Sequence, residues 1–451
     1  MDIKKLINDV TSSPPRIILL SYLFIIFLGS LLLYLPFSTT KTISYIDALF
    51  TTVSAITDTG LIVLETPKDF TAFGKMVILL LIHIGGLGYM AMTTFFILSF
   101  RQKISFKDRL ILAESLNYPG VGGLIKFLLR VLVFVAIIES IGALLLFIGF
   151  IKNFSFLTAL KYSIFHSISA FNNAGFTLFS NNLIDFKDSL LINFTIAALI
   201  IVGSIGFFVI NDFYLFFRKE VKRISNHTLI ACFTSLYLIF FGAALIIIFE
   251  HANYKGLWSL NWLDRIVAAI FHSISTRTAG FNTVDISNFT DATLSIMSAL
   301  MFVGASPGST GGGIKTTTIT VIFLAIVNYI KGSNDVNFNY RKINVEQVYK
   351  ALVIFSLAFI YITLVAIFIS KLENVTFTRS LFEVISAFST VGLSVGNGGV
   401  LSLSADFTIL GKVIIMSTMF IGKIGLLSFV IALSKKPKES RIKYPEARIL
   451  I

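Results

Sequence analysis

Long apolar runs, separated by short polar connections, dominate this chain of 451 residues. A helix needs roughly 20 apolar residues to cross the hydrocarbon layer of a bilayer. Eight runs reach or approach that length, of which the last named here is interrupted by glycines: 19–33, 77–100, 127–151, 190–217, 229–249, 351–369, 409–433 and 294–330. Charged residues make up only 14% of the chain, against about 25% in a soluble domain. We therefore expect an all-α integral membrane protein with eight transmembrane helices.

The net charge of +13 is distributed unevenly along the chain. Short basic connections, at 101–130, 218–223 and 331–350 and at both termini, alternate with longer connections that are nearly neutral. Because Lys and Arg are retained on the cytoplasmic side of a membrane, we expect a multi-pass protein of the inner or plasma membrane with both termini in the cytoplasm. The basic excess then reflects topology and contact with membrane lipid, and no nucleic-acid partner is expected.

Four of the outer connections carry copies of one pattern. Each copy is a short apolar segment rich in Ser, Thr and Phe, followed by a polar stretch that ends in glycine and a hydrophobic residue. The second and third copies share Phe-His-Ser-Ile-Ser at 165–169 and 271–275, and Ala-Gly-Phe at 174–176 and 279–281. Such self-similarity indicates duplication. We expect four fused span–pore-helix–span repeats around one pseudo-fourfold pore, at 17–100, 124–217, 227–330 and 346–434, which form one membrane domain followed by a cytoplasmic tail at 435–451.

The short apolar segments are too short to cross a bilayer, which is typical of re-entrant helices. Irregular backbone at membrane depth survives only where protein or a water-filled cavity surrounds it. The carboxyl end of a half-helix is partly negative, and rings of backbone carbonyls replace the hydration shell of a cation. A single copy of this kind is more often a helix end with a glycine cap, but four copies favour a cation filter. The expected filter residues are Thr57, Asp58, Thr59, Gly60, Asn172, Asn173, Ala174, Gly175, Arg277, Thr278, Ala279, Gly280, Ser389, Thr390, Val391 and Gly392.

At these residues the sequence resembles the Trk/Ktr/HKT superfamily of potassium transporters, most closely its KtrB branch, the membrane subunits of bacterial Ktr uptake systems. The most specific stretches are 83–88, 172–176, 276–281 and 420–425. The resemblance covers essentially the whole chain. It implies K⁺ uptake at the bacterial inner membrane, with K⁺ ions bound in the pore and no cofactor in this chain. It also implies a homodimer and a cytosolic nucleotide-binding regulatory ring of KtrA-like RCK subunits.

Two features of the first filter copy bear on selectivity. In this superfamily a serine in place of the first filter glycine is associated with Na⁺ permeation, so Gly60 favours K⁺. Asp58 is unusual beside it. A carboxylate at that position gathers cations at a pore mouth or caps a turn, and the turn role is slightly favoured.

The second span of the third repeat is interrupted by glycines and a proline, which break helices. A broken helix inside a membrane lines a cavity and points to a functional site. The resemblance implies that the segment 304–313 is an intramembrane gate loop. The alternative is a passive kink in the helix. Nucleotide binding is rejected because Ile314 separates the last glycine from Lys315. Lys423 matches a basic position of the superfamily beside the pore, and ionisable residues in spans are either functional or reach the interface. The expected gate residues are Gly304, Ser306, Gly308, Ser309, Thr310, Gly311, Gly312, Gly313, Lys315 and Lys423.

Three functions compete. A gated K⁺-selective pore is favoured because the four copies share one orientation. A coupled secondary transporter, for example a Na⁺-dependent one, is the alternative, although inverted repeats are typical of that class. An intramembrane enzyme that uses His166 with Ser167, or His272 with Ser273, is not expected, because adjacency alone does not make a nucleophile–base pair. Glu139 is a further buried charge, with no partner predicted.

Overall fold

The computed structural model describes residues 14–88, 122–333, 335–396 and 400–433. The expected cytoplasmic tail at 435–451, most of the basic connection at 101–130 and the last part of the first repeat lie outside the described residues. The elements are α2 (Pro14–Tyr34), α3 (Tyr45–Ile56), α4 (Thr66–Asp69), α5 (Ala72–Leu87), α8 (Leu124–Phe150), α9 (Phe156–Phe171), η1 (Ile184–Phe186), α10 (Leu190–Ile205), α11 (Phe207–Phe217), α12 (Asn226–Phe249), η2 (Leu257–Ser259), α13 (Trp262–Ser275), η3 (Ile286–Asn288), α14 (Asp291–Phe302), α15 (Thr316–Ile330), β1 (Asn337–Phe338), β2 (Arg341–Lys342), α16 (Val345–Glu373), α17 (Phe377–Phe388), η4 (Leu403–Asp406), α18 (Ile409–Ile424) and α19 (Leu426–Leu433). The regular structure of the described chain is thus helical apart from one antiparallel hairpin and two isolated β-bridges.

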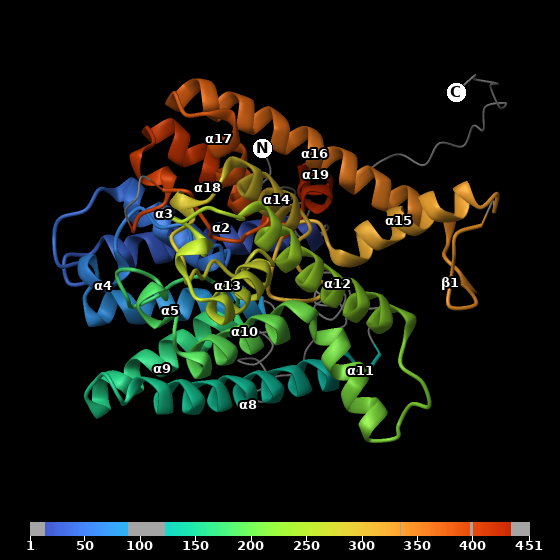
Figure 1. Ribbon diagram of the computed structural model, residues 1–451, viewed down its shortest axis with the longest axis horizontal. Helices are drawn as coiled ribbons and strands as arrows, with labels where there is room; N and C mark the ends of the chain where they lie inside the picture. The colour runs from blue at the N-terminus through green and yellow to red at the C-terminus, as the bar shows by residue number, and fades with distance from the viewer. Residues whose placement is uncertain (1–13, 89–121, 334, 397–399, 434–451) are drawn as a thin grey trace, which may run out of the picture.

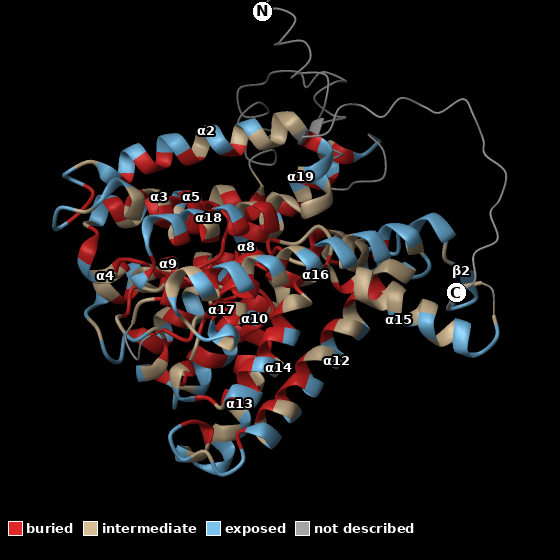
Figure 2. Ribbon diagram, turned by 90° about the horizontal axis from the view of Figure 1, so that it is seen from above, coloured by how far each residue is buried: buried red, intermediate tan, exposed pale blue. Residues whose placement is uncertain are grey.

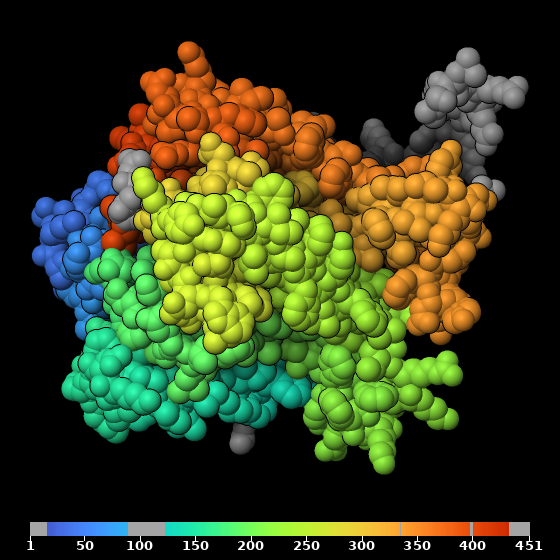
Figure 3. Space-filling view, viewed as in Figure 1, coloured from blue at the N-terminus to red at the C-terminus, as the bar shows by residue number. Residues whose placement is uncertain are grey.

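The same order of elements occurs four times. A long helix is followed by a short helix, an irregular segment and a second helix, in the groups α2–α3–α5, α8–α9–α10, α12–α13–α14 and α16–α17–α18. The groups occupy successive sectors of the molecule, from blue through teal and yellow-green to orange and red (Figures 1 and 3). The long helices lie at the periphery with exposed outer faces, and buried residues are concentrated around the short helices (Figure 2).

Length and hydropathy mark four helices in the described part as able to cross a membrane: Arg16–Tyr34, Leu124–Phe150, Asn226–Phe249 and Val345–Leu372. Two bent pairs, α10 with α11 and α18 with α19, raise the number to as many as six. The expected eight spans require in addition α5, which ends at the edge of the described residues, and the separate helices α14 and α15. The many apolar helices therefore agree with a multi-pass membrane protein, while the count of eight stays a prediction.

Two apolar runs that the sequence predicted as continuous spans are sharply bent. Helices α10 and α11 meet at 93° and helices α18 and α19 at 96°. The joints are Gly206, with φ of 102°, and Gly425, with φ of 91°. This left-handed backbone is readily adopted only by glycine. The sequence predicted an interrupted span only in the third repeat. It did not predict these two bends, because composition alone does not distinguish a glycine at a bend from a glycine inside a straight span.

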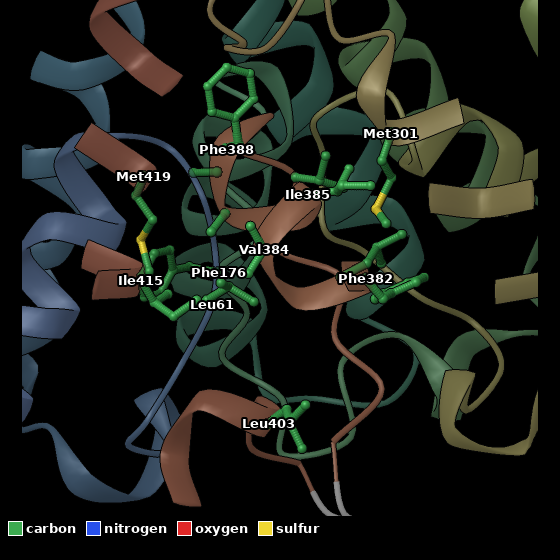
Figure 4. Packing of buried hydrophobic residues seen from close by; sticks show 14 of the residues in the cluster. Leu61, Phe176, Met301, Phe382, Val384, Ile385, Phe388, Leu403, Ile415 and Met419 are labelled. Atoms are coloured by element: carbon green, nitrogen blue, oxygen red, sulfur yellow. The ribbon is translucent and has the colours of Figure 1, made fainter. Parts of the chain in front are cut away.

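The core surrounds the irregular segments that follow the short helices. The hydrophobic residue after each repeated glycine is fully or almost fully buried, namely Leu61, Phe176, Phe281 and Leu393. Leu61 and Phe176 lie in one hydrophobic cluster with Ile415 and Met419 of α18 (Figure 4). Burial of a side chain of this size is worth about 1.5–3 kcal/mol. These anchors therefore fix the position of each irregular segment relative to its short helix.

Candidate functional site: four converging loops

The four short helices α3, α9, α13 and α17 end in loops that share one type of hydrogen bond to the helix. In every loop the residue before the repeated glycine donates its N–H to the carbonyl of a serine in the helix. These bonds join Thr59 to Ser54 (2.9 Å), Ala174 to Ser169 (2.8 Å), Ala279 to Ser275 (3.0 Å) and Val391 to Ser386 (2.8 Å). The bond spans five residues in three loops and four in the third, which is one residue shorter, so the copies recognised in the sequence share this contact.

Left-handed residues occur at the same two places in each loop. The first is Asp58, Asn173, Thr278 or Thr390, with φ between 51° and 69°, and the second is the glycine two residues later, with φ between 69° and 88°. Left-handed backbone is uncommon for residues other than glycine. Alternation of backbone handedness turns successive peptide N–H groups toward one side of a loop, so the carbonyls of these peptide groups point to the other side. Each loop can therefore present several carbonyls in one direction.

The four glycines form a closed ring. A Cβ built on Gly60 would lie 2.5 Å from the carbonyl oxygen of Ala174, one on Gly175 would lie 3.0 Å from that of Ala279, and one on Gly280 would lie 2.6 Å from that of Val391. A Cβ on Gly392 would overlap the carbonyl oxygen of Thr59, which returns the ring to its start. The loops approach one another so closely that only glycine fits at these four positions.

The repeated serine of each short helix ties its loop to the helix. The N–H of Gly60 donates to Ser54 Oγ (3.1 Å), and the N–H of Gly392 donates to Ser386 Oγ (3.0 Å). In the other two loops the hydroxyl donates instead, from Ser169 to the Phe176 carbonyl and from Ser275 to the Phe281 carbonyl. The sequence contained this signal, because serine occupies the same place in all four copies, but its role depends on the folded loop.

A cavity of about 190 Å³ opens beside the ring. All four glycines line it, together with residues from the segments that follow them, such as Thr177, Asn282 and Leu393. The carboxylate in its described lining belongs to Asp285, not to Asp58. Asp285 was missed in the sequence because it lies outside the repeated pattern. The expected filter residues are buried, apart from a partly exposed Gly392.

The broken span of the third group packs directly against these loops. Between α14 and α15, the segment 303–315 is not helical. The N–H of Gly312 donates to Thr390 Oγ1 (2.8 Å), the N–H of Ser306 donates to the Ser204 carbonyl (3.0 Å), and the Gly308 carbonyl accepts from the N–H of Phe207 (2.7 Å). The expected gate residues are therefore in contact with the fourth loop and with the bend of α10.

Both lysines predicted within spans point into the protein. Lys423 Nζ lies 2.6 Å from Asp58 Oδ2 and donates to the Thr310 carbonyl at 2.6 Å. Lys315 Nζ donates to the Gly311 carbonyl. Asp58 is fully buried, and its carboxylate pairs with Lys423, a partner that neither of the two expected roles includes. Sequence reasoning weighed Asp58 and Lys423 separately, because nothing local links residues so far apart.

Two other charged side chains near the loops, those of Glu139 and Arg277, differ in their partners. Glu139 of α8, for which no partner was predicted, accepts from Asn172 Nδ2 at 3.0 Å and lies 3.6 Å from His83 Nδ1. The Arg277 side chain is buried, and its two terminal nitrogens have no hydrogen-bond partner among the described residues.

The two His-Ser pairs do not form nucleophile–base pairs. His166 Nδ1 lies 2.7 Å from the Tyr162 carbonyl, and His166 Nε2 accepts from the N–H of Leu178. Ser167 donates to the carbonyl of Glu139, and Ser273 donates to that of Ile239. Catalysis requires the hydroxyl to face the base, so these hydroxyls are engaged in holding helices together.

Comparison with known proteins adds the following relatives. A family model, TrkH, described as a cation transport protein, matches residues 13–444. The Ktr system potassium uptake protein B of Bacillus subtilis is 38% identical, over 99% of this chain and 98% of the relative. The protein of the same description from Vibrio alginolyticus is 37% identical, over 97% and 94%. The potassium/sodium uptake protein NtpJ of Enterococcus hirae is 34% identical, over 97% of each chain. All of these names describe transporters rather than enzymes.

A solved structure has the same fold. The crystal structure of the potassium transporter TrkH from Vibrio parahaemolyticus superimposes with a TM-score of 0.73, over 93% of this chain and 84% of that chain. The two sequences are only 17% identical in this alignment. The overall arrangement of helices is therefore shared.

Proposed function

Because this chain belongs to the TrkH family of cation transport proteins, we propose that it is the K⁺-selective translocating subunit of a regulated bacterial potassium uptake system. Two full-length relatives are named potassium uptake proteins of Ktr systems. Permeation is channel-like, through a filter of backbone carbonyls. K⁺ is the ion bound in the pore, and no cofactor of this chain takes part.

The observation that carries this proposal is the ring of Gly60, Gly175, Gly280 and Gly392. Four loops of alternating handedness, each anchored to the carboxyl end of a short helix, are suited to replace the hydration shell of a cation with carbonyl oxygens. The partly negative helix ends favour a cation at the same place. The filter consists of the loop residues 57–60, 172–175, 277–280 and 389–392.

The proposed architecture has eight membrane spans in four repeats around the ring, with both termini in the cytoplasm. The repeats are 17–100, 124–217, 227–330 and 346–434. The four groups of long, short and second helices support this division. The proposed gate is the loop 304–313, together with Lys315 and Lys423, supported by its hydrogen bonds to the fourth filter loop and to the bend of α10.

Cation flux into liposomes that contain the purified protein tests the proposal. Fluxes of K⁺, Rb⁺, Na⁺ and Li⁺ are compared for the wild type, Gly280→Ser and the control Gly332→Ser. Both glycines have φ of 75°, but a Cβ at Gly332 meets nothing within 4 Å, whereas one at Gly280 lies 2.6 Å from a filter carbonyl. Passive flux that favours K⁺ and Rb⁺, with selectivity lost only in Gly280→Ser, supports the proposal. Flux that is indifferent to Gly280 contradicts the filter.

A coupled, for example Na⁺-dependent, transporter is the second candidate, because one relative is named a potassium/sodium uptake protein. The same liposomes separate the two. Coupled transport stops when Na⁺ is removed and drives K⁺ uphill on a Na⁺ gradient. A pore conducts K⁺ down its own gradient in either condition.

The proposal of regulatory partners is supported by the names of two relatives, which describe them as proteins of a Ktr system. The proposed assembly is a homodimer on a cytosolic nucleotide-binding ring of KtrA-like RCK subunits, in contact with membrane lipid. The exposed, basic turn at 218–223 is a proposed docking surface, and the basic residues 101–109 lie outside the described residues. Light scattering of the purified protein tests the proposed dimer. Co-purification with a ring subunit, before and after replacement of the basic residues of the turn, tests the proposed docking surface.

A further inference from the structure

Two ion pairs join the first and fourth repeats. Lys412 Nζ lies 2.8 Å from Asp47 Oδ1, and Lys423 Nζ lies 2.6 Å from Asp58 Oδ2. Each pair spans 365 positions in the sequence, so α18 runs in the same direction as α3, with one pair near the start of α3 and the other in the loop that follows it. This seam lies between the first and last repeats, which no linker joins directly.

The two pairs differ in their surroundings. The side chains of Lys412 and Asp47 are 13% and 20% exposed, whereas those of Lys423 and Asp58 are 8% and 0% exposed. Asp58 lies in the first filter loop, and its Oδ1 has no hydrogen-bond partner among the described residues. The inner pair thus lies at the filter, and the outer pair serves as a natural comparison for it.

The inner pair also reaches the gate loop. Lys423 donates to the carbonyl of Thr310, and Lys315 donates to the next carbonyl, that of Gly311. Two ammonium groups therefore donate to consecutive carbonyls beneath the filter. The carboxylate of Asp58 offsets one of their two positive charges. Loss of Asp58 doubles the net positive charge of this cluster in a medium of low dielectric constant, where charges interact strongly.

Comparison of the repeats within this chain shows that the charges of Asp58 and Lys423 are particular to the first and fourth repeats. The Gly-x-x-Gly stretch that contains Lys423 recurs in the first two repeats, where the corresponding residues are Gly86 and Ser204. The position of Asp58 corresponds to Asn173, Thr278 and Thr390 in the other loops. An acid and a base thus occur where these other copies are uncharged, and the fold brings them together.

We propose that Asp58 is the counter-ion that holds the Lys423 ammonium away from the ion path, and that this pair sets the electrostatic barrier between filter and gate loop. Asp58 is a positioning residue, which acts on permeating ions through Lys423. Without Asp58, the free ammonium repels cations below the filter. Without Lys423, the bare carboxylate attracts them. This inference rests on the proposed function.

Liposome flux of Rb⁺ as a function of cation concentration tests the inference. The variants are Asp58→Asn, Lys423→Met and the double variant, with Asp47→Asn and Asp47→Asn/Lys412→Met as the matched set from the outer pair. We expect Asp58→Asn to lower maximal flux about tenfold or more and to raise the half-saturating concentration, since tenfold corresponds to only about 1.4 kcal/mol. Lys423→Met lowers the half-saturating concentration. The double variant recovers to within about threefold of the wild type, because buried ion pairs are often replaceable as a unit.

Opposite shifts of the half-saturating concentration distinguish electrostatics from damage, since loss of folded protein lowers maximal flux without such shifts. Maximal flux is divided by the amount of monodisperse protein to remove differences in folding. The outer-pair variants keep wild-type flux per folded molecule. The inference is overturned if the double variant is as slow as Asp58→Asn, if both single variants shift concentration dependence in one direction, or if the outer pair gives the same result. A wild type without cation flux overturns the proposed function as well.

Discussion

The hydroxyl of Thr390 in the fourth filter loop accepts a hydrogen bond from the backbone N–H of Gly312, at 2.8 Å. This contact joins the proposed filter to the proposed gate loop. We expect Thr390→Val to leave the Gly312 N–H without a partner, at a cost of about 1–3 kcal/mol. The gate loop then opens more readily, and K⁺ flux rises severalfold with unchanged selectivity. Liposome flux measures this change.

The control for that change is Thr363→Val on α16, where the hydroxyl bonds only to the carbonyl of Phe359 in its own helix. It should conduct as the wild type does. If Thr390→Val also conducts as the wild type does, the gate loop is not held by this bond.

The serine of the fourth short helix gives a second prediction. Ser386 Oγ accepts from the N–H of Gly392 at 3.0 Å, so Ser386→Ala leaves this partly buried donor without its partner, at up to about 1–3 kcal/mol. We expect reduced discrimination between K⁺ and Na⁺, measured as the ratio of their fluxes. Ser140→Ala removes a hydroxyl that bonds within the exposed face of α8 and should leave the ratio unchanged. An equal loss in both variants contradicts the role of the tether.

Close packing at Gly203 gives a third prediction. A Cβ at this position overlaps the carbonyl oxygen of Phe171, the last residue of α9. Overpacking of this kind costs about 1–3 kcal/mol or more, so Gly203→Ala should lower the thermal unfolding midpoint in detergent. Gly122→Ala, where nothing lies within 4 Å of the new Cβ, should not. An unchanged unfolding midpoint for Gly203→Ala means that α9 and α10 move apart to accept the methyl group without loss of stability.

Glu139 gives a fourth prediction, which distinguishes its charge from its hydrogen bond. Asn172 Nδ2 donates to Glu139 Oε1 at 3.0 Å, and glutamine keeps an oxygen acceptor at that place. We expect Glu139→Gln to unfold at the wild-type temperature. Glu139→Ala removes the acceptor and creates a cavity, so it should destabilise the protein by about 2 kcal/mol or more. Equal destabilisation by both variants indicates that the charge itself is required.

Much of the fold could be predicted from the sequence because it depends on local composition and on repetition. The apolar runs and low charge predicted a helical membrane protein, and the family resemblance, based on stretches such as 172–176 and 276–281, is confirmed by the family match and the full-length relatives. The count of eight spans stays a prediction. The bends at Gly206 and Gly425 escaped sequence reasoning, because a glycine in an apolar run does not reveal its backbone angle.

Some candidate site residues could be predicted from the sequence and others could not. The repeated glycines could be identified because the same residue recurs at the same place in four copies. The roles of the repeated serines could not be read, since each depends on which atom of the folded loop comes within hydrogen-bond distance. Asp285, which lines the cavity beside the ring, belongs to no repeated pattern and was invisible for that reason.

By itself the sequence determined the class of protein, the fourfold repetition and the family, since these follow from residue type and order along the chain. Only the tertiary structure decided that Asp58 meets Lys423, that the four glycines close into a ring in chain order, and that the proposed gate loop bonds to Thr390. The physical reason is distance along the chain. Contacts between residues 365 positions apart arise from the packing of whole helices, which no local pattern specifies.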